Sequence, residues 1–446
     1  NDNSLISNTS ISQNNELSEI LIAESILDRE SSNYNYNLNY NFKINKSSNL
    51  SSEISFGNFN TSGSTLQPNK YVEADGETLI SNADRSFDSD TRIDLFSAKI
   101  DYEKSWKKFK FSTGSKYVSV ATKNKFAFYN VVNTVPELDL TRSNDFSYNE
   151  DVFALYGIFD IKLNEFTSLN AGIRMENTAS RGILESIQVI ENTDVIRGYT
   201  NFFPNIGLSF SDKERHAVTI SVGRRISRPN YQNLNPFESP QSELSVWKGN
   251  PFLNPSYTMN YQLTYSLNQR LTITNSYSVT TDFFANLIEV SGERGNIIIP
   301  RNMDRITNYA LSISYPYPVT KFWDFLGMFN AGYNTYQGLI EGIEIDLNNT
   351  RWDFSLQNNF KLPWGIKFEL TYTQTSNWIW RGSIDVEGNS NLRFGLRKDF
   401  FNNQLQLRIT GNDLLYTGSE YFYYGNYGGI IIDGVRTFDN RRFGVS

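Results

Sequence analysis

The sequence of 446 residues contains no cysteine and a single histidine, His216. The absence of cysteine excludes disulfides and thiolate metal sites, and it suits an oxidising compartment such as the periplasm or the cell surface. A transition-metal site needs several histidine or cysteine ligands, so one histidine predicts none. His216 follows the turn-like stretch SDKER, and we interpret it as a solvated side chain at the start of a strand. We therefore expect neither a metal nor a cofactor.

The sequence also lacks long apolar runs. No window approaches the roughly 18 consecutive apolar residues of a membrane-spanning helix, which excludes transmembrane helices. A mean hydropathy of −0.45 is nevertheless compatible with a transmembrane barrel, because only alternate residues of its strands face lipid. A net charge of −7 argues against nucleic acid as a partner.

No catalytic constellation is recognisable. A nucleophile motif is missing, and the asparagine-rich stretches lack the ligand spacing of an EF-hand calcium site. Carboxylates alternate with cations in RWDF, IKFEL and AKIDY, which predicts ion pairs in a lumen rather than an acid–base couple. We therefore expect that the protein is not an enzyme.

What the sequence has is aromatic residues, 15% of the chain, arranged with a period of two. Residues 33–44 read NYNYNLNYNFKI: asparagine and lysine alternate with Tyr34, Tyr36, Leu38 and further large apolar side chains. A period of two predicts a strand. At about 3.3 Å per residue this strand spans roughly 40 Å, and tilted by about 45° it crosses roughly 28 Å, close to the hydrocarbon thickness of a bilayer.

The same unit repeats to the end of the chain and gives about 17 strands. Eight short turns alternate with eight long polar connections, as in outer-membrane barrels, which have short periplasmic turns and long extracellular loops. We expect the short turns at 45–48, 105–108, 163–166, 211–214, 268–270, 316–321, 361–365 and 400–403 to lie at one end. Trp106, Trp323 and Trp364 lie at these turns, where an aromatic girdle is expected. The predicted fold is an all-β, antiparallel, up-and-down transmembrane barrel of the outer-membrane type.

We expect that the two ends of the chain do not close this barrel by themselves. We expect residues 1–30 to be a loop or extension segment and residues 31–446 to be the barrel. The chain begins at Asn1 without a methionine or a signal-like segment, so we expect a mature product or a part of a longer one. An odd number of strands leaves the end strands parallel, and we expect both to have unpaired edges that further strands cover, because lipid cannot satisfy a free edge.

Three segments resemble a known family. They are NFFPNIGLSF (201–210), GRRISRPNYQNLNPF (223–237) and KGNPFLNPSYTMNYQLTYS (248–266). Together with the terminal DNRRFGVS they resemble the β-barrel domain of TonB-dependent receptors of Bacteroidetes, in the outer-membrane protein β-barrel family. The resemblance covers the chain from about residue 30 to the end.

The resemblance implies a barrel of 22 strands in the outer membrane, a plug domain inside it, and energised uptake through the TonB complex. No plug and no TonB-contacting segment is recognisable in this chain, which fits the C-terminal part of a longer receptor. The implied partners are outer-membrane lipid, a plug domain of the same polypeptide and TonB. A surface lipoprotein is a further candidate partner.

Candidate substrate-binding residues lie in the proline-containing motifs and near one strand end. Prolines stop the strand that ends near Arg225, so residues 229–256 form a shaped loop. The simpler interpretation is that the motif residues fix the shape and the position of this loop. The alternative is that the loop contacts a substrate directly. Trp378 and Trp380 belong either to an aromatic girdle or to a site that stacks on a ring. The candidate residues are Arg228, Tyr231, Trp247, Trp378 and Trp380.

The sequence leaves two functions open. The first is the barrel portion of a TonB-dependent receptor for energised uptake of a nutrient too large for porins. The second is a barrel that transports nothing and anchors a surface or secretion complex. The sequence does not identify a substrate, because specificity lies in loops that follow no general code.

Overall fold

The computed structural model describes residues 3–13, 16–186, 194–236, 238–290, 296–340, 343–380, 384–418, 420–427, 430–437 and 440–446. Strands dominate this part of the chain, in one sheet of 23 strands and one of four. Within the same ranges, no helix is long and apolar enough to cross a membrane.

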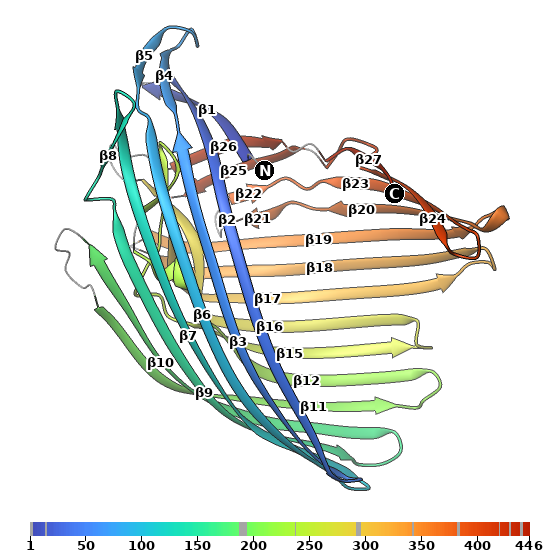
Figure 1. Cartoon of the computed structure of the whole chain (residues 1–446). Helices are drawn as coiled ribbons and strands as arrows, with labels where there is room; N and C mark the ends of the chain where they lie inside the picture. Colours follow the sequence, from blue (N-terminus) through green and yellow to red (C-terminus); the bar gives the residue numbers. More distant parts are fainter. Residues whose placement is uncertain are drawn as a thin grey trace.

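Seventeen strands pair side by side to form a curved wall (Figure 1). In order around the wall they are β2 (Glu16–Asn45), β3 (Ser48–Gln67), β6 (Arg85–Ser105), β7 (Phe109–Val132), β9 (Asn144–Lys162), β10 (Thr167–Ser186), β11 (Asp194–Ser211), β12 (His216–Ser227), β15 (Ser256–Leu267), β16 (Leu271–Val290), β17 (Asn296–Pro318), β18 (Trp323–Ile340), β19 (Ile343–Lys361), β20 (Ile366–Thr375), β23 (Ser390–Phe400), β24 (Leu405–Asn412) and β27 (Arg442–Val445). Each is antiparallel to its neighbours. The predicted fold and strand number are confirmed.

The short turns all connect strands at the same end of the wall (Figure 1). This follows from the antiparallel order, because every second connection returns to the same side. The side chain of Trp364, 84% exposed, lies in a short 3-10 turn, η2 (Pro363–Gly365), and Trp106 lies between β6 and β7. Both occupy the end where an aromatic girdle was predicted.

The strands continue much further at the opposite end than the sequence suggested. The long polar connections expected from the sequence include those from β3 to β6 and from β7 to β9. The structure instead extends β3, β6, β7 and β9 into these regions, and β7 alone has 24 residues. The prediction failed because pairing beyond the bilayer needs only backbone hydrogen bonds, and the alternation that lipid imposes is no longer required there.

Smaller strands lengthen this outer end. They are β1 (Asn3–Gln13), β4 (Asn69–Glu73), β5 (Leu79–Asn82) and β8 (Val135–Leu138). Two others, β13 (Glu238–Ser242) and β14 (Ser245–Lys248), form a hairpin in the connection from β12 to β15. A separate sheet contains β21 (Trp378–Trp380), β22 (Ile384–Val386), β25 (Glu420–Tyr427) and β26 (Ile430–Thr437).

Residues 1–30 were expected to be a loop or an extension segment, and the described residues among them are strands at the outer end of the wall. Residues 3–13 form β1 and residues 16–30 form the outer half of β2, paired antiparallel. Around Leu21 and Ala23, which are buried, both faces of the strand carry apolar side chains. The alternation of polar and apolar residues that predicts a strand is therefore absent from the sequence of this segment.

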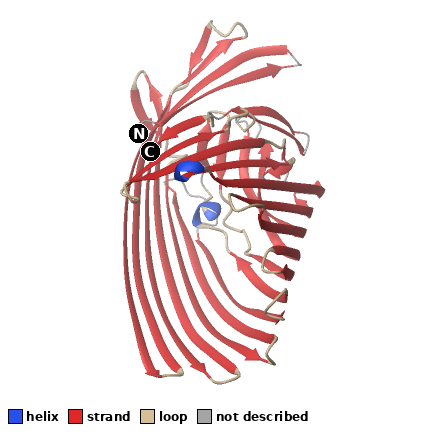
Figure 2. Ribbon diagram, turned by 90° about the vertical axis from the view of Figure 1, so that its right-hand side faces the viewer, coloured by secondary structure: helices blue, strands red, loops and turns tan. Residues whose placement is uncertain are grey.

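The two faces of β2 differ as predicted. Tyr36 lies opposite Phe56 on β3, and Phe56 lies opposite Phe96 on β6, so the aromatic row continues from strand to strand. Asn39 lies opposite Glu53, and Glu53 lies opposite Lys99, so the asparagines share the polar face. The polar face is the concave one, because residues 228–255 pack against it further along the wall (Figure 2).

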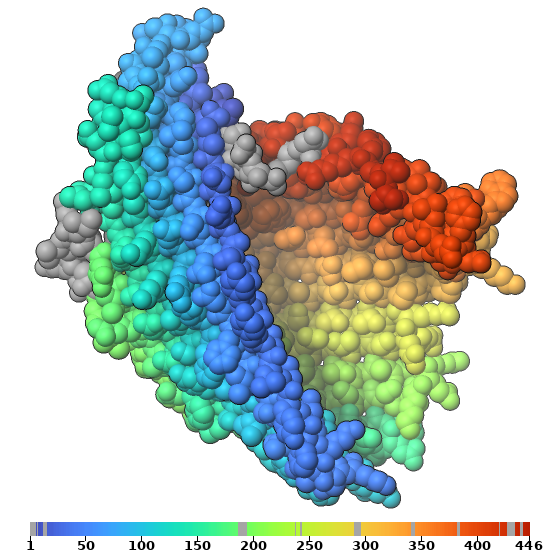
Figure 3. Space-filling model, in the orientation of Figure 1, coloured from blue at the N-terminus to red at the C-terminus, as the bar shows by residue number. Residues whose placement is uncertain are grey.

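The wall has two strands with partners on one side only. In the described residues, positions 33–45 of β2 pair with β3 alone, and β27 pairs with β24 alone. No pairing in this part of the chain joins β2 to β27. Figure 3 shows the opening between the blue edge strand and the orange strands of the opposite side. This arrangement agrees with the expected free edges.

Candidate functional site

The candidate site is formed where the chain leaves the wall after β12. β11 and β12 pair only as far as Asn205 and Gly223, although β11 continues to pair with β10 beyond this point. From residue 228 to residue 255 the chain runs inside the curve of the wall, where Figure 2 shows it with its short helix. We call residues 228–255 the lumen segment.

Arg228 attaches the start of the lumen segment to the wall. Its Nη2 donates to Oε2 of Glu176 over 2.6 Å and to Oγ1 of Thr178 over 2.9 Å. Oε1 of Glu176 accepts from Nε of Arg174 at 2.5 Å. Both oxygens of this buried carboxylate are therefore used, and Arg228 holds the segment in place rather than lining the cavity described below.

A single helical turn, α1 (Tyr231–Leu234), follows Arg228. Oδ1 of Asn230 accepts from the backbone N–H of Asn233 over 2.8 Å and caps this turn. Leu234 is buried against wall residues Phe146 and Leu184. Tyr231 is half-buried at the first position of α1, and its hydroxyl accepts from Nε2 of Gln232 at 3.4 Å. It is not among the residues that line the cavity.

The Gly-Asn-Pro motif closes the lumen segment on itself. A Cβ at Gly249 would lie 2.2 Å from the carbonyl oxygen of Asn235, so only glycine fits. The N–H of Asn250 donates to the carbonyl of Asn233 over 2.6 Å. Arg197 on β11 donates to the carbonyl oxygens of Pro251 and Leu253. These contacts fit the interpretation that the motif residues fix the shape and the position of the loop. Phe237, which belongs to the same motifs, lies outside the described residues.

A cavity of about 430 Å³ lies between the lumen segment and the inner faces of β6 and β7. From the wall it is lined by Phe87, Ser89, Thr91, Asn124 and Phe126. From the lumen segment it is lined by Gln232, Asn235, Glu238, Ser239 and Trp247. The rings of Phe87 and Phe126 are 5.7 Å apart between centroids. Of the five predicted binding residues, Trp247 is the one that lines this cavity.

The β13–β14 hairpin carries Trp247 and spans from one side of the wall to another. Trp247 pairs with Ser239 within the hairpin. On its other side β14 is parallel to β17, where Trp247 pairs with Ile298. Nζ of Lys248 lies 3.9 Å from Oε1 of Glu238 at the base of the hairpin. The charge of the one carboxylate that lines the cavity is therefore balanced by a neighbouring cation.

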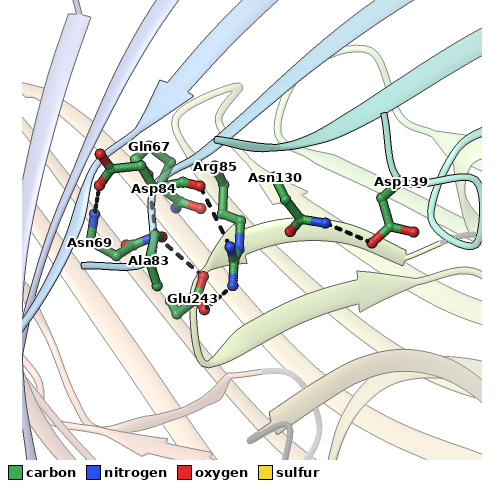
Figure 4. Close-up of polar contacts among 8 residues, drawn as sticks. All are labelled: Gln67, Asn69, Ala83, Asp84, Arg85, Asn130, Asp139 and Glu243. Carbon is green, nitrogen blue, oxygen red and sulfur yellow. Dashed lines mark hydrogen bonds and ion pairs between the residues drawn. The ribbon is translucent and has the colours of Figure 1, made fainter. Parts of the chain in front are cut away.

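The tip of this hairpin is attached to the wall by Glu243 (Figure 4). Oε1 of Glu243 accepts from Nη2 of Arg85 over 3.1 Å, and Oε2 accepts from Nδ2 of Asn69 over 3.2 Å. Burial raises the pKa of Glu243, and the nearby cations Arg85 and Arg142 partly offset this effect. Because Arg85 lies on the same face as Phe87, this contact lies directly beside the cavity wall.

The remaining predicted residues lie elsewhere. Trp378 and Trp380 belong to β21, which pairs with β22 in the four-stranded sheet, and they line none of the cavities described. The guanidinium of Arg351 lies 5.7 Å from the ring centroid of Trp378. The structure therefore does not bring these tryptophans together with Trp247.

A second cavity, of about 500 Å³, lies where the β11–β12 ladder ends. It is lined by Arg174, Arg224 and Arg225 together with neutral side chains and Glu176. The guanidinium of Arg224 also lies 4.7 Å from the ring centroid of Tyr257. This cavity is basic, whereas the cavity of Trp247 is not.

No group of three or more His, Cys, Asp or Glu side chains within the described ranges is arranged to hold a metal ion. Nδ1 of His216 lies 2.8 Å from the hydroxyl oxygen of Tyr265 near a short turn.

The structure resembles three solved proteins at low sequence identity. Copper transporter OprC has a TM-score of 0.64 at 11% identity, with 99% of this chain and 78% of that chain covered. The ferric-catecholate import receptor Fiu from K12 E. coli has a TM-score of 0.56 at 11% identity, covering 99% of this chain and 78% of that one. The siderophore receptor PiuA from Acinetobacter baumannii has a TM-score of 0.55 at 11% identity, covering 98% and 75%.

These similarities show the fold alone. No curated protein sequence matches the chain. The sequence model of one family, in contrast, matches residues 40–446. Because this match covers most of the chain, the protein belongs to the outer membrane protein beta-barrel family and lies in the outer membrane.

Proposed function

We propose that this chain is the barrel portion of a TonB-dependent outer-membrane receptor that imports a nutrient too large for porins. The observation that carries the proposal is the open cavity of about 430 Å³ on the concave side of the wall, between the wall and the lumen segment. Ligand sites commonly have volumes of about 300–1,000 Å³. The proposal is also supported by the names of the structurally similar proteins, which are transporters and import receptors.

The proposal includes further strands and a plug domain of the same polypeptide. Positions 33–45 of β2 have a backbone edge for which the described residues offer no partner. An unsatisfied backbone group costs several kcal/mol in lipid, so such an edge must be covered in the membrane. The concave face is polar and carries Asn39, Glu53 and Lys99, which suits contact with a soluble domain inside the barrel.

The alternative is a barrel that anchors a surface complex without transport. It is favoured by exposed apolar side chains on the outer extensions, which lie beyond the membrane-spanning part of the wall. These residues are Leu79, Ile80, Val135 and Leu138. Such residues are typical of protein interaction surfaces. A surface lipoprotein that covers the outer end would serve either function.

Deletion of the gene for the full-length receptor, with and without complementation, tests the proposal. We expect the deletion to reduce uptake of one large nutrient in a panel. In complemented cells, a protonophore should abolish the uptake that depends on the receptor, while the abundance of the receptor stays constant. Wild-type uptake of every nutrient in the deletion strain would reject the proposal, and loss of a surface complex in that strain would favour the alternative.

A further inference from the structure

We propose that the cavity lined by Trp247 binds a neutral carbohydrate. This inference rests on the proposed function and names the substrate class of the same site. The cavity combines aromatic side chains, uncharged hydrogen-bonding groups and a balanced charge.

Aromatic rings lie on both sides of the cavity. Phe87 and Phe126 come from neighbouring wall strands, and their rings are 5.7 Å apart with an angle of 40° between the planes. Trp247 lines the cavity from the lumen segment. Phe128 lies directly opposite Phe87 on β7, with ring centroids 6.5 Å apart. Aromatic faces offer apolar surface, and the C–H faces of a pyranose ring are the part of a sugar that such a surface desolvates.

The phenylalanines are unusual for their position. They lie on the concave face of the wall, where the neighbouring positions Ser89 and Thr91 of the same strand are polar. A polar interior is the rule in outer-membrane barrels of this type. An aromatic row on this face is therefore not required by the membrane, and it suits a ligand that is itself partly apolar.

The other lining groups are amides and hydroxyls. Ser89, Thr91 and Asn124 come from the wall, and Gln232, Asn235 and Ser239 come from the lumen segment. Amide and hydroxyl side chains supply both donors and acceptors without charge. Sugar hydroxyls also donate and accept, so this set of groups complements them on both sides of the cavity.

The charge of the cavity disfavours ionic ligands. Glu238 is the one charged residue among those that line it, and Nζ of Lys248 lies 3.9 Å from its carboxylate. An anionic ligand would instead match the second cavity, which is lined by Arg174, Arg224 and Arg225 against one carboxylate, Glu176. The contrast between the two cavities favours a neutral ligand beside Trp247.

Binding of defined oligosaccharides to the purified full-length receptor in detergent tests the inference. The probes are maltohexaose, xylohexaose, mannohexaose and cellohexaose as neutral sugars, a galacturonic acid hexamer as an acidic sugar, and ferric citrate as an anionic chelate. We expect at least one neutral hexasaccharide to bind, as measured by calorimetry, and Trp247→Ala to weaken that binding at least tenfold. Trp247→Phe should retain most of the affinity, because it keeps an aromatic face.

Two further variants keep the test decisive if Trp247→Ala does not fold. Gln232→Ala removes an exposed hydrogen-bonding group that lines the cavity, and it should weaken binding severalfold. Trp364→Ala removes an exposed tryptophan from a short turn at the opposite end of the wall and should leave binding unchanged. Failure of all neutral sugars to bind, a preference for the acidic sugar or the chelate, or equal affinity of the Trp247 and Gln232 variants with wild type would overturn the inference. Energised uptake of a different nutrient would then leave the receptor function standing.

Discussion

Arg228 and Glu176, which are 52 residues apart in the sequence, form a largely buried ion pair of 2.6 Å between Nη2 and Oε2. This pair joins the lumen segment to β10. The position of the lumen segment therefore depends on this contact with the wall. The cavity between the segment and the wall depends on the same contact.

Replacement of Glu176 by glutamine should release the lumen segment. The change leaves Arg228 without its anionic partner, and breaking one side of a buried pair costs about 3–5 kcal/mol. The side chain of Arg228 is 22% exposed, so we expect a loss near the lower limit of this range. Tryptic cleavage after Lys248, which lies within the segment, should become at least tenfold faster in the folded barrel. An unchanged cleavage rate would contradict the anchoring role of the pair.

The matched control for this variant is the ion pair between Lys213 and Glu165. It joins two short turns at 3.9 Å, and both side chains are largely exposed. Exposed pairs contribute about 0–1 kcal/mol. Glu165→Gln should therefore leave the cleavage rate within the segment unchanged.

Gly249→Ala should disturb the lumen segment for a steric reason. The new Cβ would meet the carbonyl oxygen of Asn235 at 2.2 Å and that of Gln232 at 2.6 Å. Overpacking of this kind costs about 1–3 kcal/mol. Amide hydrogen exchange should accelerate in residues 230–236 and 248–253. At Gly198 a Cβ would meet nothing within 4 Å, so Gly198→Ala serves as the control and should leave exchange in these residues as in wild type.

The wall could be predicted from the sequence because lipid imposes a strict alternation. Tyr36 and Leu38 must lie on one face and Asn37 on the other, and the short turns then determine the direction of each strand. Outside the membrane this constraint ends. Leu21 and Ala23 are buried in a strand that has no visible alternation, and this segment was accordingly predicted to be a loop or an extension rather than part of the barrel.

The candidate site could be predicted only in part. Trp247, which lines the cavity, was proposed from the sequence because it lies between proline-containing motifs that indicated a shaped loop. Phe87, Phe126 and Glu243 were missed because their roles depend on where the loop meets a wall more than 100 residues away in the chain. The one available signal was the presence of phenylalanines at positions that the register assigns to the polar face. This signal can be recognised only when the strand register is known, and the sequence alone does not determine the register of this region.

Attachment of the hairpin tip should strengthen as the pH falls. Burial raises the pKa of Glu243 above its ordinary value of 4.5. The carboxylate of Glu243 therefore binds a proton more tightly in the attached hairpin than in the free one. Attachment becomes more stable as the pH falls through the raised pKa, and this added stability is lost as the pH rises above that pKa. The groups that face Glu243 are Arg85, Arg142 and Tyr71, and burial followed by the charge of Glu243 raises the pKa of Tyr71.

Hydrogen exchange of the β13–β14 hairpin between about pH 4.5 and pH 7 measures this effect. We expect slower exchange at the lower pH after correction for the intrinsic rate. Glu243→Gln keeps the shape of the side chain and removes its titration, so the corrected rate should no longer change with pH. Equal pH dependence in this variant and in wild type would show that another group titrates.

The two faces of β2 can be distinguished by charge substitution at neighbouring positions. Leu38 lies seven residues from the end of the strand at Asn45, which places it roughly 16 Å into the bilayer at about 3.3 Å per residue and about 45° of tilt. An arginine facing lipid near the midplane costs about 2–4 kcal/mol. Leu38→Arg should therefore reduce the amount of folded receptor in the outer membrane severalfold, as judged by heat-modifiable migration in gels. Asn37→Arg introduces the same side chain one residue away on the polar face and should leave folding close to wild type. Equal folding of the two variants would mean that this face of β2 does not contact lipid.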